Sequence, residues 1–197
     1  GLPKGVLNIV HGFGHKVGSA IVSSKQVPLI SFTGGTVTGA NIASVAAPMF
    51  KKLSLELGGK NPNIIFADCD YDKMLSTTMN SSFANQGQIC LCGSRIFVEK
   101  SIYEKFKNDF VAKTKAMVIG SPMADPTRIG AVVSKSHMEK ILSYVELAKQ
   151  EGGTVLCGGK PFQMSGEFEN GYYLEPTIIE GLAYNCRTNQ EEIFGPV

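Results

Sequence analysis

The chain has 197 residues, 43% of them hydrophobic and 18% charged, and its formal net charge is +2. This composition is typical of a soluble globular protein with one domain or parts of two. The small net charge and the scattered lysines argue against a nucleic-acid partner, and no apolar run approaches the roughly 20 residues needed to cross a bilayer. We therefore expect neither a nucleic-acid nor a membrane partner, and we predict a cytoplasmic location.

The first 58 residues alternate between strand and helix patterns. We predict a strand at 7–10, a glycine turn and helix around 11–24, a strand at 27–35, a helix at 36–50 and a strand at 51–59. This β-α-β-α order favours a parallel sheet. The glycine pair Gly58-Gly59 marks a change in composition, and we place a domain boundary there.

The remaining residues continue the same alternation. We predict strands in 61–70, 95–100, 154–158 and an extended run at 172–182, helices at 71–86, 101–117 and 134–150, and a turn-rich loop or hairpin at 157–171. Asp70 is the expected N-cap of the helix at 71–86, and Gly87 is its expected C-terminal signal.

We expect the five cysteines to be reduced thiols. Their number is odd, none lies in a C-x-x-C motif, and a chain of this size does not need disulfides for stability. Cys90 and Cys92 could begin a metal site. However, zinc needs three or four ligands, and none of the three histidines has ligand-like spacing to this pair. We therefore predict no metal. Each of the two thiols could be either a small apolar packing residue or a nucleophile.

Two glycine motifs precede helices. Gly12-Phe13-Gly14 followed by Gly18 misses the dinucleotide fingerprint by one residue and suits a tight turn equally well. "FTGGTVTG" at 32–39 follows a strand and opens a helix, where free N–H groups can receive a phosphate. A nucleoside-triphosphate loop would need Lys and then Ser or Thr after its last glycine, and neither is present. Cofactor phosphate binding and close helix-sheet packing therefore both remain open.

Glu56 is a candidate partner for a nucleophilic cysteine. A free thiol is only about 3% ionised at neutral pH, so it needs a base, a cation or a helix terminus to act. Glu56 lies between two leucines and before a glycine pair. We expect it to be partly desolvated with a raised pKa, as suits a general base.

Three motifs, "LELGGKNPNIIF", "FANQGQIC" and "EEIFGPV", follow one another in this order. Together they resemble the NAD(P)-dependent aldehyde dehydrogenase superfamily, over the whole chain but only a central part of the family's usual length. The resemblance implies an α/β fold. Residues 1–58 would be the C-terminal part of a Rossmann-like cofactor domain, and residues 59–197 most of an α/β catalytic domain with a parallel-rich sheet, incomplete at its C-terminus.

The resemblance also implies roles for individual residues. Cys90 matches the catalytic cysteine and Glu56 the general base, whereas Cys92 matches no required position. The cofactor-binding positions are Gly34 and Gly35 near the pyrophosphate, Glu192 and Phe194 near the nicotinamide ribose and ring, and also Gly39 and Leu57. Most members have Ser where Gly35 stands, so phosphate contact here would depend more on backbone N–H groups.

The implied reaction is oxidation of an aldehyde to a carboxylic acid through a thioester on Cys90, with NAD as cofactor and NADP as the alternative. "GQICLCGSRIFVEKSIYEKF" is most similar to the 2-aminomuconate and 2-hydroxymuconate semialdehyde dehydrogenases. Betaine and aliphatic aldehydes are the alternative substrates, and a homo-oligomer, dimer or tetramer, is expected at full length.

A competing hypothesis is a non-catalytic product. The sequence begins with Gly and ends at Val197 without a closing element, so we expect a fragment. The oxyanion asparagine of the family and the residues that select between NAD and NADP would precede it. A truncated isoform or a binding module is therefore the alternative to an enzyme.

Overall fold

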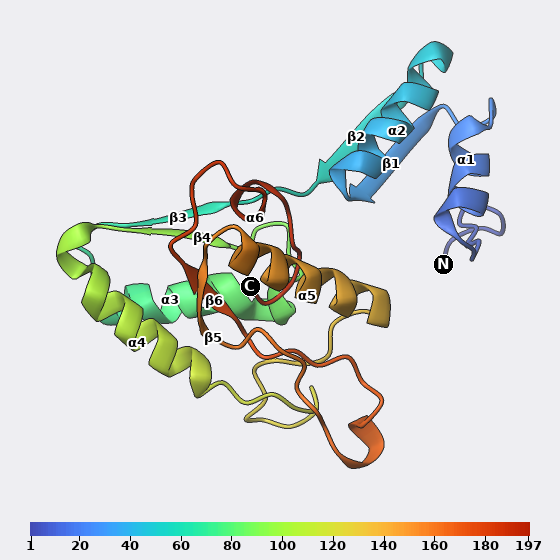
Figure 1. The fold of residues 1–197 in the computed structure, drawn as a ribbon. Helices are drawn as coiled ribbons and strands as arrows, with labels where there is room; N and C mark the ends of the chain where they lie inside the picture. Colours follow the sequence, from blue (N-terminus) through green and yellow to red (C-terminus); the bar gives the residue numbers. More distant parts are fainter. The chain divides into compact units, whose positions relative to one another are not determined.

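The computed structural model describes residues 1–197, which form two compact units, Gly1–Gly58 and Gly59–Val197. Both units combine helices with short strands (Figure 1). None of the helices has the length and apolar character needed to cross a bilayer. The cofactor-binding and catalytic roles expected for the two stretches remain predictions.

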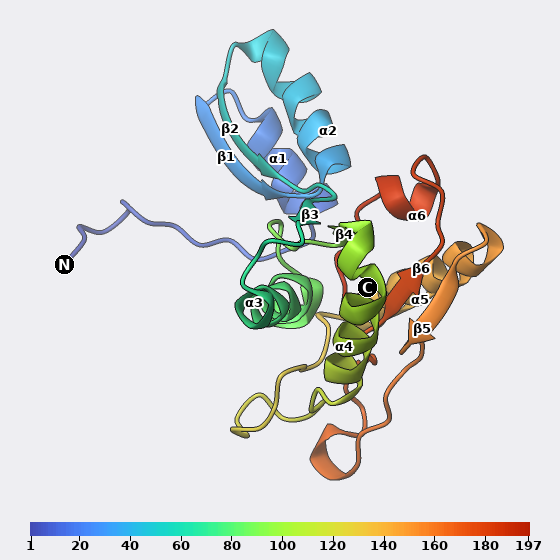
Figure 2. The same ribbon diagram turned by 90° about the vertical axis from the view of Figure 1, so that its left-hand side faces the viewer.

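The first unit contains one β-α-β motif. Its elements are η1 (Gly14–Gly18), α1 (Ser19–Ser23), β1 (Leu29–Gly34), α2 (Thr36–Ala46), η2 (Ala47–Met49) and β2 (Lys52–Leu57). β1 and β2 pair in parallel, from Leu29 opposite Lys52 to Gly34 opposite Leu57. α2 covers one face of the pair in both ribbon views (Figure 2).

The alternation of side chains along each strand explains why only one face of this pair is covered. The apolar side chains on this face are Ile30 and Phe32 of β1 and Leu53 and Leu55 of β2, which form a core with Val22, Ile42, Ala46 and other residues. Intervening residues such as Ser31, Ser54 and Glu56 are exposed. Because successive side chains of a strand point to opposite faces, the apolar residues pack on α2 and the polar ones face away from it.

The predicted strand at 7–10 is wrong. Residues 7–10 have no regular structure, and Leu7, Ile9 and Val10 are exposed. A strand makes no hydrogen bonds within itself, so an apolar run becomes a strand only where a neighbour pairs with it. Here the strand pairs of the unit are formed by β1 and β2 alone.

The second unit is larger. Its elements are β3 (Pro62–Ile65), α3 (Tyr71–Phe83), η3 (Ala84–Gly87), β4 (Arg95–Val98), η4 (Lys100–Ile102), α4 (Tyr103–Lys115), α5 (Lys135–Gln150), β5 (Thr154–Cys157), η5 (Gly166–Phe168), β6 (Ile178–Glu180) and α6 (Arg187–Gln190). β3 pairs with β4 in parallel, and β5 pairs with β6 antiparallel. The predicted extended run at 172–182 is a strand only over β6.

Side-chain caps mark the starts of two helices of this unit, and the Asp70 cap of α3 confirms the predicted one. The Asp70 carboxylate accepts a hydrogen bond from the Lys73 N–H at 3.3 Å, and the Ser134 hydroxyl accepts one from the His137 N–H at 3.2 Å. Each cap satisfies one of the N–H groups that have no partner inside the helix. Local sequence is therefore enough to define the starts of α3 and α5.

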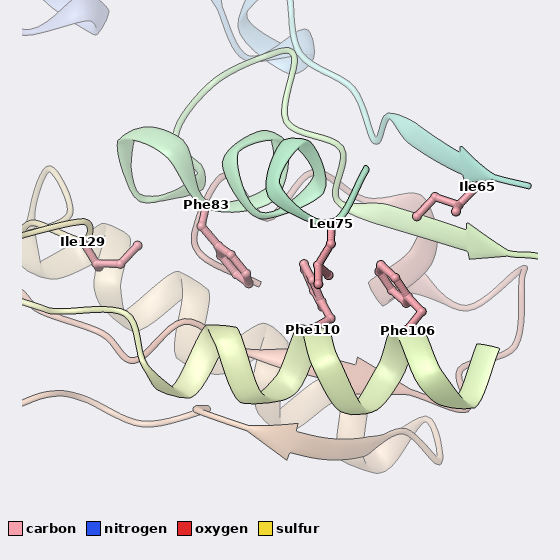
Figure 3. Close-up of a cluster of buried hydrophobic side chains, with 6 residues drawn as sticks. All are labelled: Ile65, Leu75, Phe83, Phe106, Phe110 and Ile129. Carbon is pink, nitrogen blue, oxygen red and sulfur yellow. The ribbon is translucent and has the colours of Figure 1, made fainter. Parts of the chain in front are cut away.

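The main core of the second unit lies between α3 and α4 (Figure 3). Leu75 and Phe83 of α3 point toward Phe106 and Phe110 of α4. The Phe110 ring stacks on both Phe83 and Phe106, with centroid distances of 5.8 and 5.1 Å. Residues four apart lie on the same helix face, so Phe106 and Phe110 can stack on each other while both are buried.

A second core cluster consists of Val132, Ile141, Leu174 and Ile193. Ile141 is a buried residue of α5, and Ile193 is the apolar residue of "EEIFGPV". Their packing places this motif against α5. The side chains on either side of Ile193 are thereby held at the surface of the unit, where the candidate site is formed.

Candidate active site

The cysteine motif lies in a loop that follows a broken helix. α3 ends at Phe83, so the helix predicted to continue to Gln86 is three residues too long. Asn85, Gln86 and Gly87 adopt left-handed backbone conformations, with φ of 49°, 57° and 68°. Such φ values are uncommon for residues other than glycine, and contacts from elsewhere in the fold are needed to hold them.

Side-chain amides supply several of these contacts. The Gln86 Oε1 accepts a hydrogen bond from the Gly130 N–H at 3.0 Å, and the Gln88 Oε1 accepts one from the Val133 N–H at 3.1 Å. The Asn85 Nδ2 donates to the Gln88 carbonyl at 3.1 Å. The polar residues of "ANQGQ" thus hold the chain reversal that leads to Cys90.

The Cys90 side chain is exposed, and its backbone is held by a hydrogen bond at the carbonyl oxygen. The Asn61 Nδ2 donates hydrogen bonds to the Cys90 carbonyl at 2.6 Å and to the Cys92 carbonyl at 3.1 Å. No protein group accepts a hydrogen bond from the Cys90 N–H. The loop therefore presents a thiol and a free N–H at the same residue, as addition to a carbonyl group requires.

Cys92 has the opposite environment. Only 8% of its surface is exposed, and burial raises the pKa of its thiol. A buried thiol with a raised pKa is a poor nucleophile and a good packing residue. The two cysteines of the motif are therefore chemically different, although they are two positions apart.

The structure brings the cysteine motif and the "EEIFGPV" motif together. A Cβ atom at Gly87 would lie 2.1 Å from the Gly195 carbonyl oxygen, so the two backbones are in direct contact there. Phe194 has a φ of 61° and is 36% exposed. Its carbonyl accepts a hydrogen bond from the His137 Nε2 at 2.6 Å, and its ring lies edge-on to the His137 ring at 6.1 Å.

Glu192 lies on the same surface and is held at both its side chain and its backbone. Its Oε1 accepts a hydrogen bond from the Gly59 N–H at 3.3 Å, and its carbonyl accepts one from the Lys140 Nζ at 3.1 Å. Glu192, Phe194, Lys60 and Cys92 share the lining of a small cavity. Burial, with a contribution from the Arg95 charge, lowers the pKa of Lys60 to about 8.

The preceding residue, Glu191, anchors this motif. Its carboxylate accepts hydrogen bonds from the Arg187 Nε at 2.7 Å, from the Arg187 Nη2 at 3.0 Å and from the Tyr144 hydroxyl. Hydrogen bonds from Arg187 and Tyr144 lower the pKa of Glu191 to about 2. An ionised Glu191 is therefore held between α5 and α6, and it fixes the backbone that carries Glu192.

In the first unit, the glycine motif opens α2. Gly35 is the N-cap, no side chain caps the helix, and a Cβ atom at Gly35 would contact nothing within 4 Å. The N–H groups of the first helical turn are therefore open to solvent. By contrast, a Cβ at Gly39 would lie 2.5 Å from Leu57 Cδ2, so this glycine allows α2 to approach β2 closely.

Glu56 lies on β2 opposite Thr33 of β1. We expected this carboxylate to be partly desolvated, and this expectation is wrong, because Glu56 is exposed in the structure. Its leucine neighbours point to the α2 side of the strand pair and Glu56 to the other side, so flanking apolar residues in sequence do not bury it.

Several residues around the site were missed from sequence. They are Asn61, His137, Lys140, Tyr144 and Arg187. Asn61, His137, Lys140 and Tyr144 each make a hydrogen bond to a residue far away in sequence. Arg187 bonds to Glu191, four residues later in the chain. The "NPN" that follows "LELGGK" is one local signal, because Asn before Pro often has a structural role at the start of a strand or turn. The i,i+4 spacing of Arg187 and Glu191 is another.

Comparison with known proteins defines the family. The aldehyde dehydrogenase family model matches residues 1–197, so the chain belongs to the aldehyde dehydrogenase family. This confirms the resemblance seen in the motifs. The α/β fold class is confirmed as well, because a betaine aldehyde dehydrogenase from Staphylococcus aureus, solved in complex with NAD+, superposes on the whole chain with a TM-score of 0.95 at 41% identity, over 39% of its own length.

Among curated relatives, the chain is 50% identical to a 2-aminomuconic semialdehyde dehydrogenase from Mus musculus and 44% identical to a 2-aminomuconic 6-semialdehyde dehydrogenase from Pseudomonas sp. Both matches cover 100% of the chain, and they cover 41% and 40% of the relatives. A 4-trimethylaminobutyraldehyde dehydrogenase B from Danio rerio is 43% identical, over 38% of its length. The chain thus spans less than half the length of these relatives.

Proposed function

We propose that this chain carries the nucleophile and the general base of an NAD-dependent aldehyde dehydrogenase that oxidises an aldehyde to a carboxylic acid. The observation that carries the proposal is the exposed Cys90 with its free N–H, on a loop in contact with the Gly195-Pro196 backbone. Family membership over residues 1–197 supports it.

The proposed chemistry assigns a role to each of these residues. The Cys90 thiolate adds to the aldehyde carbon, and the Cys90 N–H donates to the oxyanion that forms. Bound NAD supplies the acceptor for the hydride that leaves this carbon. The carbon is then held as a thioester on Cys90, and Glu56 takes a proton from the water that hydrolyses it.

The residues present fit the cofactor. The open first turn of α2 offers free N–H groups and the positive end of the helix dipole to a pyrophosphate at Gly34 and Gly35. Glu192 offers a carboxylate to ribose hydroxyls, and Phe194 an apolar ring to the nicotinamide. The betaine aldehyde dehydrogenase solved in complex with NAD+ supports NAD as the cofactor here, with NADP as the alternative.

The two cysteines test the proposal in the full-length protein. We expect Cys90→Ser to lower the rate of NADH formation by about 10³-fold or more, because a hydroxyl is a far weaker nucleophile at neutral pH. Cys92→Ser is the matched control and is expected to keep most of the activity, because Cys92 is buried. Equal losses in both variants would contradict the assignment.

The same assay tests the base. With Glu56→Gln, we expect the first turnover to form NADH at close to the normal rate, while the steady-state rate falls by about 10²-fold, because general base catalysis of thioester hydrolysis is lost. A normal steady-state rate in Glu56→Gln would exclude this role.

For the substrate, we favour a semialdehyde such as 2-aminomuconate semialdehyde, because relatives with that name are 44 to 51% identical to the chain. Relatives named for a trimethylammonium aldehyde are 41 to 43% identical. We expect kcat/KM to be at least about tenfold higher for a semialdehyde than for betaine aldehyde or a simple aliphatic aldehyde. The opposite order in a substrate panel would assign the chain to the second class.

Assembly into a dimer or tetramer and a cytoplasmic location stay predictions. Several large apolar side chains of residues 2–13 are exposed, among them Leu2, Ile9 and Phe13. Exposed apolar surface of this kind favours contacts with further protein surface. Sedimentation of the full-length protein would measure its oligomeric state, and a monomer would contradict the prediction.

A further inference from the structure

The side chain of Asn61 links the start of β3 to the cysteine loop. The backbone of Asn61 is fixed first, because its carbonyl accepts a hydrogen bond from the Arg95 N–H at 3.1 Å, next to the first residue pair of the β3-β4 ladder. The Pro62 ring that follows restricts the Asn61 backbone further. The amide therefore starts from a rigid position in the sheet.

Both hydrogens of this amide have a partner in the loop. The Nδ2 lies 2.6 Å from the Cys90 carbonyl oxygen and 3.1 Å from that of Cys92. Both partners are acceptors, so the amide nitrogen and not its oxygen must face them. A primary amide has two N–H donors, and one is available for each carbonyl.

Apart from the bonds from Asn61, the loop is anchored before and after Cys90 but not at Cys90 itself. Before it, Gly87 contacts Gly195 and Gln88 bonds to Val133. After it, the Gly93 N–H donates to Ser81 at 3.2 Å. Between these anchors, Ile89, Cys90 and Leu91 receive one hydrogen bond from outside the loop, the bond from Asn61.

We propose that Asn61 is a positioning residue for the nucleophile. By holding the Cys90 and Cys92 carbonyls on the sheet side of the loop, its amide fixes the Cys90 α-carbon, from which the thiol and the free N–H both project. This inference rests on the proposed function, in which Cys90 attacks the aldehyde. Small misplacements of a reacting group cost large factors in rate, so the amide acts on catalysis without touching the substrate.

The test measures the burst of NADH in the first turnover of the full-length enzyme. Asn61→Ala removes both donors, and Asn61→Asp keeps the shape but sets a carboxylate against two carbonyls. We expect the burst rate to fall by about tenfold or more in both variants, with the Kd for NAD unchanged. The split between burst rate and cofactor affinity is the result that simple loosening of the fold would not produce.

Asn63→Ala is the matched control. Asn63 lies on β3 two residues after Asn61, and its Nδ2 donates to the Thr78 hydroxyl at 3.1 Å and not to a carbonyl of the cysteine loop. We expect its burst rate to stay within about twofold of wild type, although its melting temperature falls as far as that of Asn61→Ala.

Three results would overturn the inference: a wild-type burst rate in either Asn61 variant, an equal loss of burst rate in Asn63→Ala, or a failure of both Asn61 variants to fold while Asn63→Ala folds. The last would show that Asn61 supports the fold as a whole. Failure of the proposed function is distinguishable, because it would appear as a normal burst in Cys90→Ser, whatever the Asn61 variants do.

Discussion

At the scale of single residues, burial separates groups that look equivalent in sequence. Cys90 is exposed with its carbonyl held by Asn61, whereas Cys92 is buried and has a raised pKa. The two glutamates of "EEIFGPV" are both partly buried and are distinguished by their hydrogen bonds instead. Glu191 is bound by Arg187 and Tyr144, and Glu192 receives only the Gly59 N–H at its side chain. In each pair, one side chain is buried or held by hydrogen bonds, and the other is left available.

The Glu191 anchor predicts a dependence of stability on pH. The folded-state pKa of Glu191 is about 2, below the value of about 4.3 for a glutamate in an unfolded chain. A depressed pKa contributes stability above the unfolded value, and this contribution is lost as the pH falls through the folded value. We expect wild type to melt at a higher temperature than Glu191→Gln at about pH 6, and the difference to close between about pH 4.3 and pH 2.

Thermal melts across this pH range would measure the effect. Glu139→Gln is the control, because Glu139 is an exposed residue of α5 whose nearest cation, the Lys135 Nζ, is 3.9 Å away. A difference between wild type and Glu191→Gln that does not change with pH would contradict the prediction, because it would then come from packing and not from the charge.

At the scale of elements, the reversal after α3 joins two motifs that are about a hundred residues apart in sequence. The chain turns through three left-handed residues and then meets the Gly195 backbone at Gly87. A glycine is required at Gly87 for two reasons, its φ of 68° and the absence of room for a Cβ. The end of α3 is therefore decided by a contact with a distant segment.

Replacing Gly87 and a control glycine by alanine separates the cost of left-handed backbone strain from the cost of the clash with Gly195. We expect Gly87→Ala to lower the free energy of unfolding by about 3 kcal/mol or more, from left-handed strain and from a backbone clash together. Gly166→Ala is the matched control, because Gly166 has a φ of 64° and an open environment, and it is expected to cost about 1–2 kcal/mol. Denaturant unfolding would measure both values, and equal losses would show that the contact with Gly195 adds nothing.

At the scale of the whole molecule, each unit has a core of its own. The first unit buries Val22, Ile30, Ile42 and Ala46, and the second has two clusters, one between α3 and α4 and one beneath α5. Phe110 is central to the larger cluster, where it stacks on two other aromatic rings. A substitution in this cluster should act on the unit that contains it.

We expect Phe110→Ala to destabilise the second unit by about 3–5 kcal/mol, because it leaves a cavity between two helices. Hydrogen exchange would show faster exchange in α3 and α4, with a smaller change in β1 and α2. Phe97→Ala is the control, because Phe97 is 43% exposed and its loss should cost much less. An equal acceleration in both units would show that they unfold together.

Much of the fold could be predicted from the sequence because its signals are local. The caps Asp70 and Ser134 place the starts of α3 and α5, apolar alternation places β1 and β2, and the order of elements indicates the α/β class, which the comparisons confirm. The three long motifs were enough to indicate the family before any contact was known. Patterns of this kind depend on neighbours within a few residues, and the chain itself carries them.

Tertiary structure decided what depends on distant partners. Residues 7–10 have the pattern of a strand and no neighbour to pair with, Glu56 has apolar neighbours in sequence and an exposed side chain, and the helix expected to reach Gln86 stops at Phe83. The support of Cys90 by Asn61 is of the same kind. These hydrogen bonds form between segments far apart in the chain, and the same segments bury or expose each other's side chains. Only the folded arrangement therefore determines which side chains meet and which remain exposed.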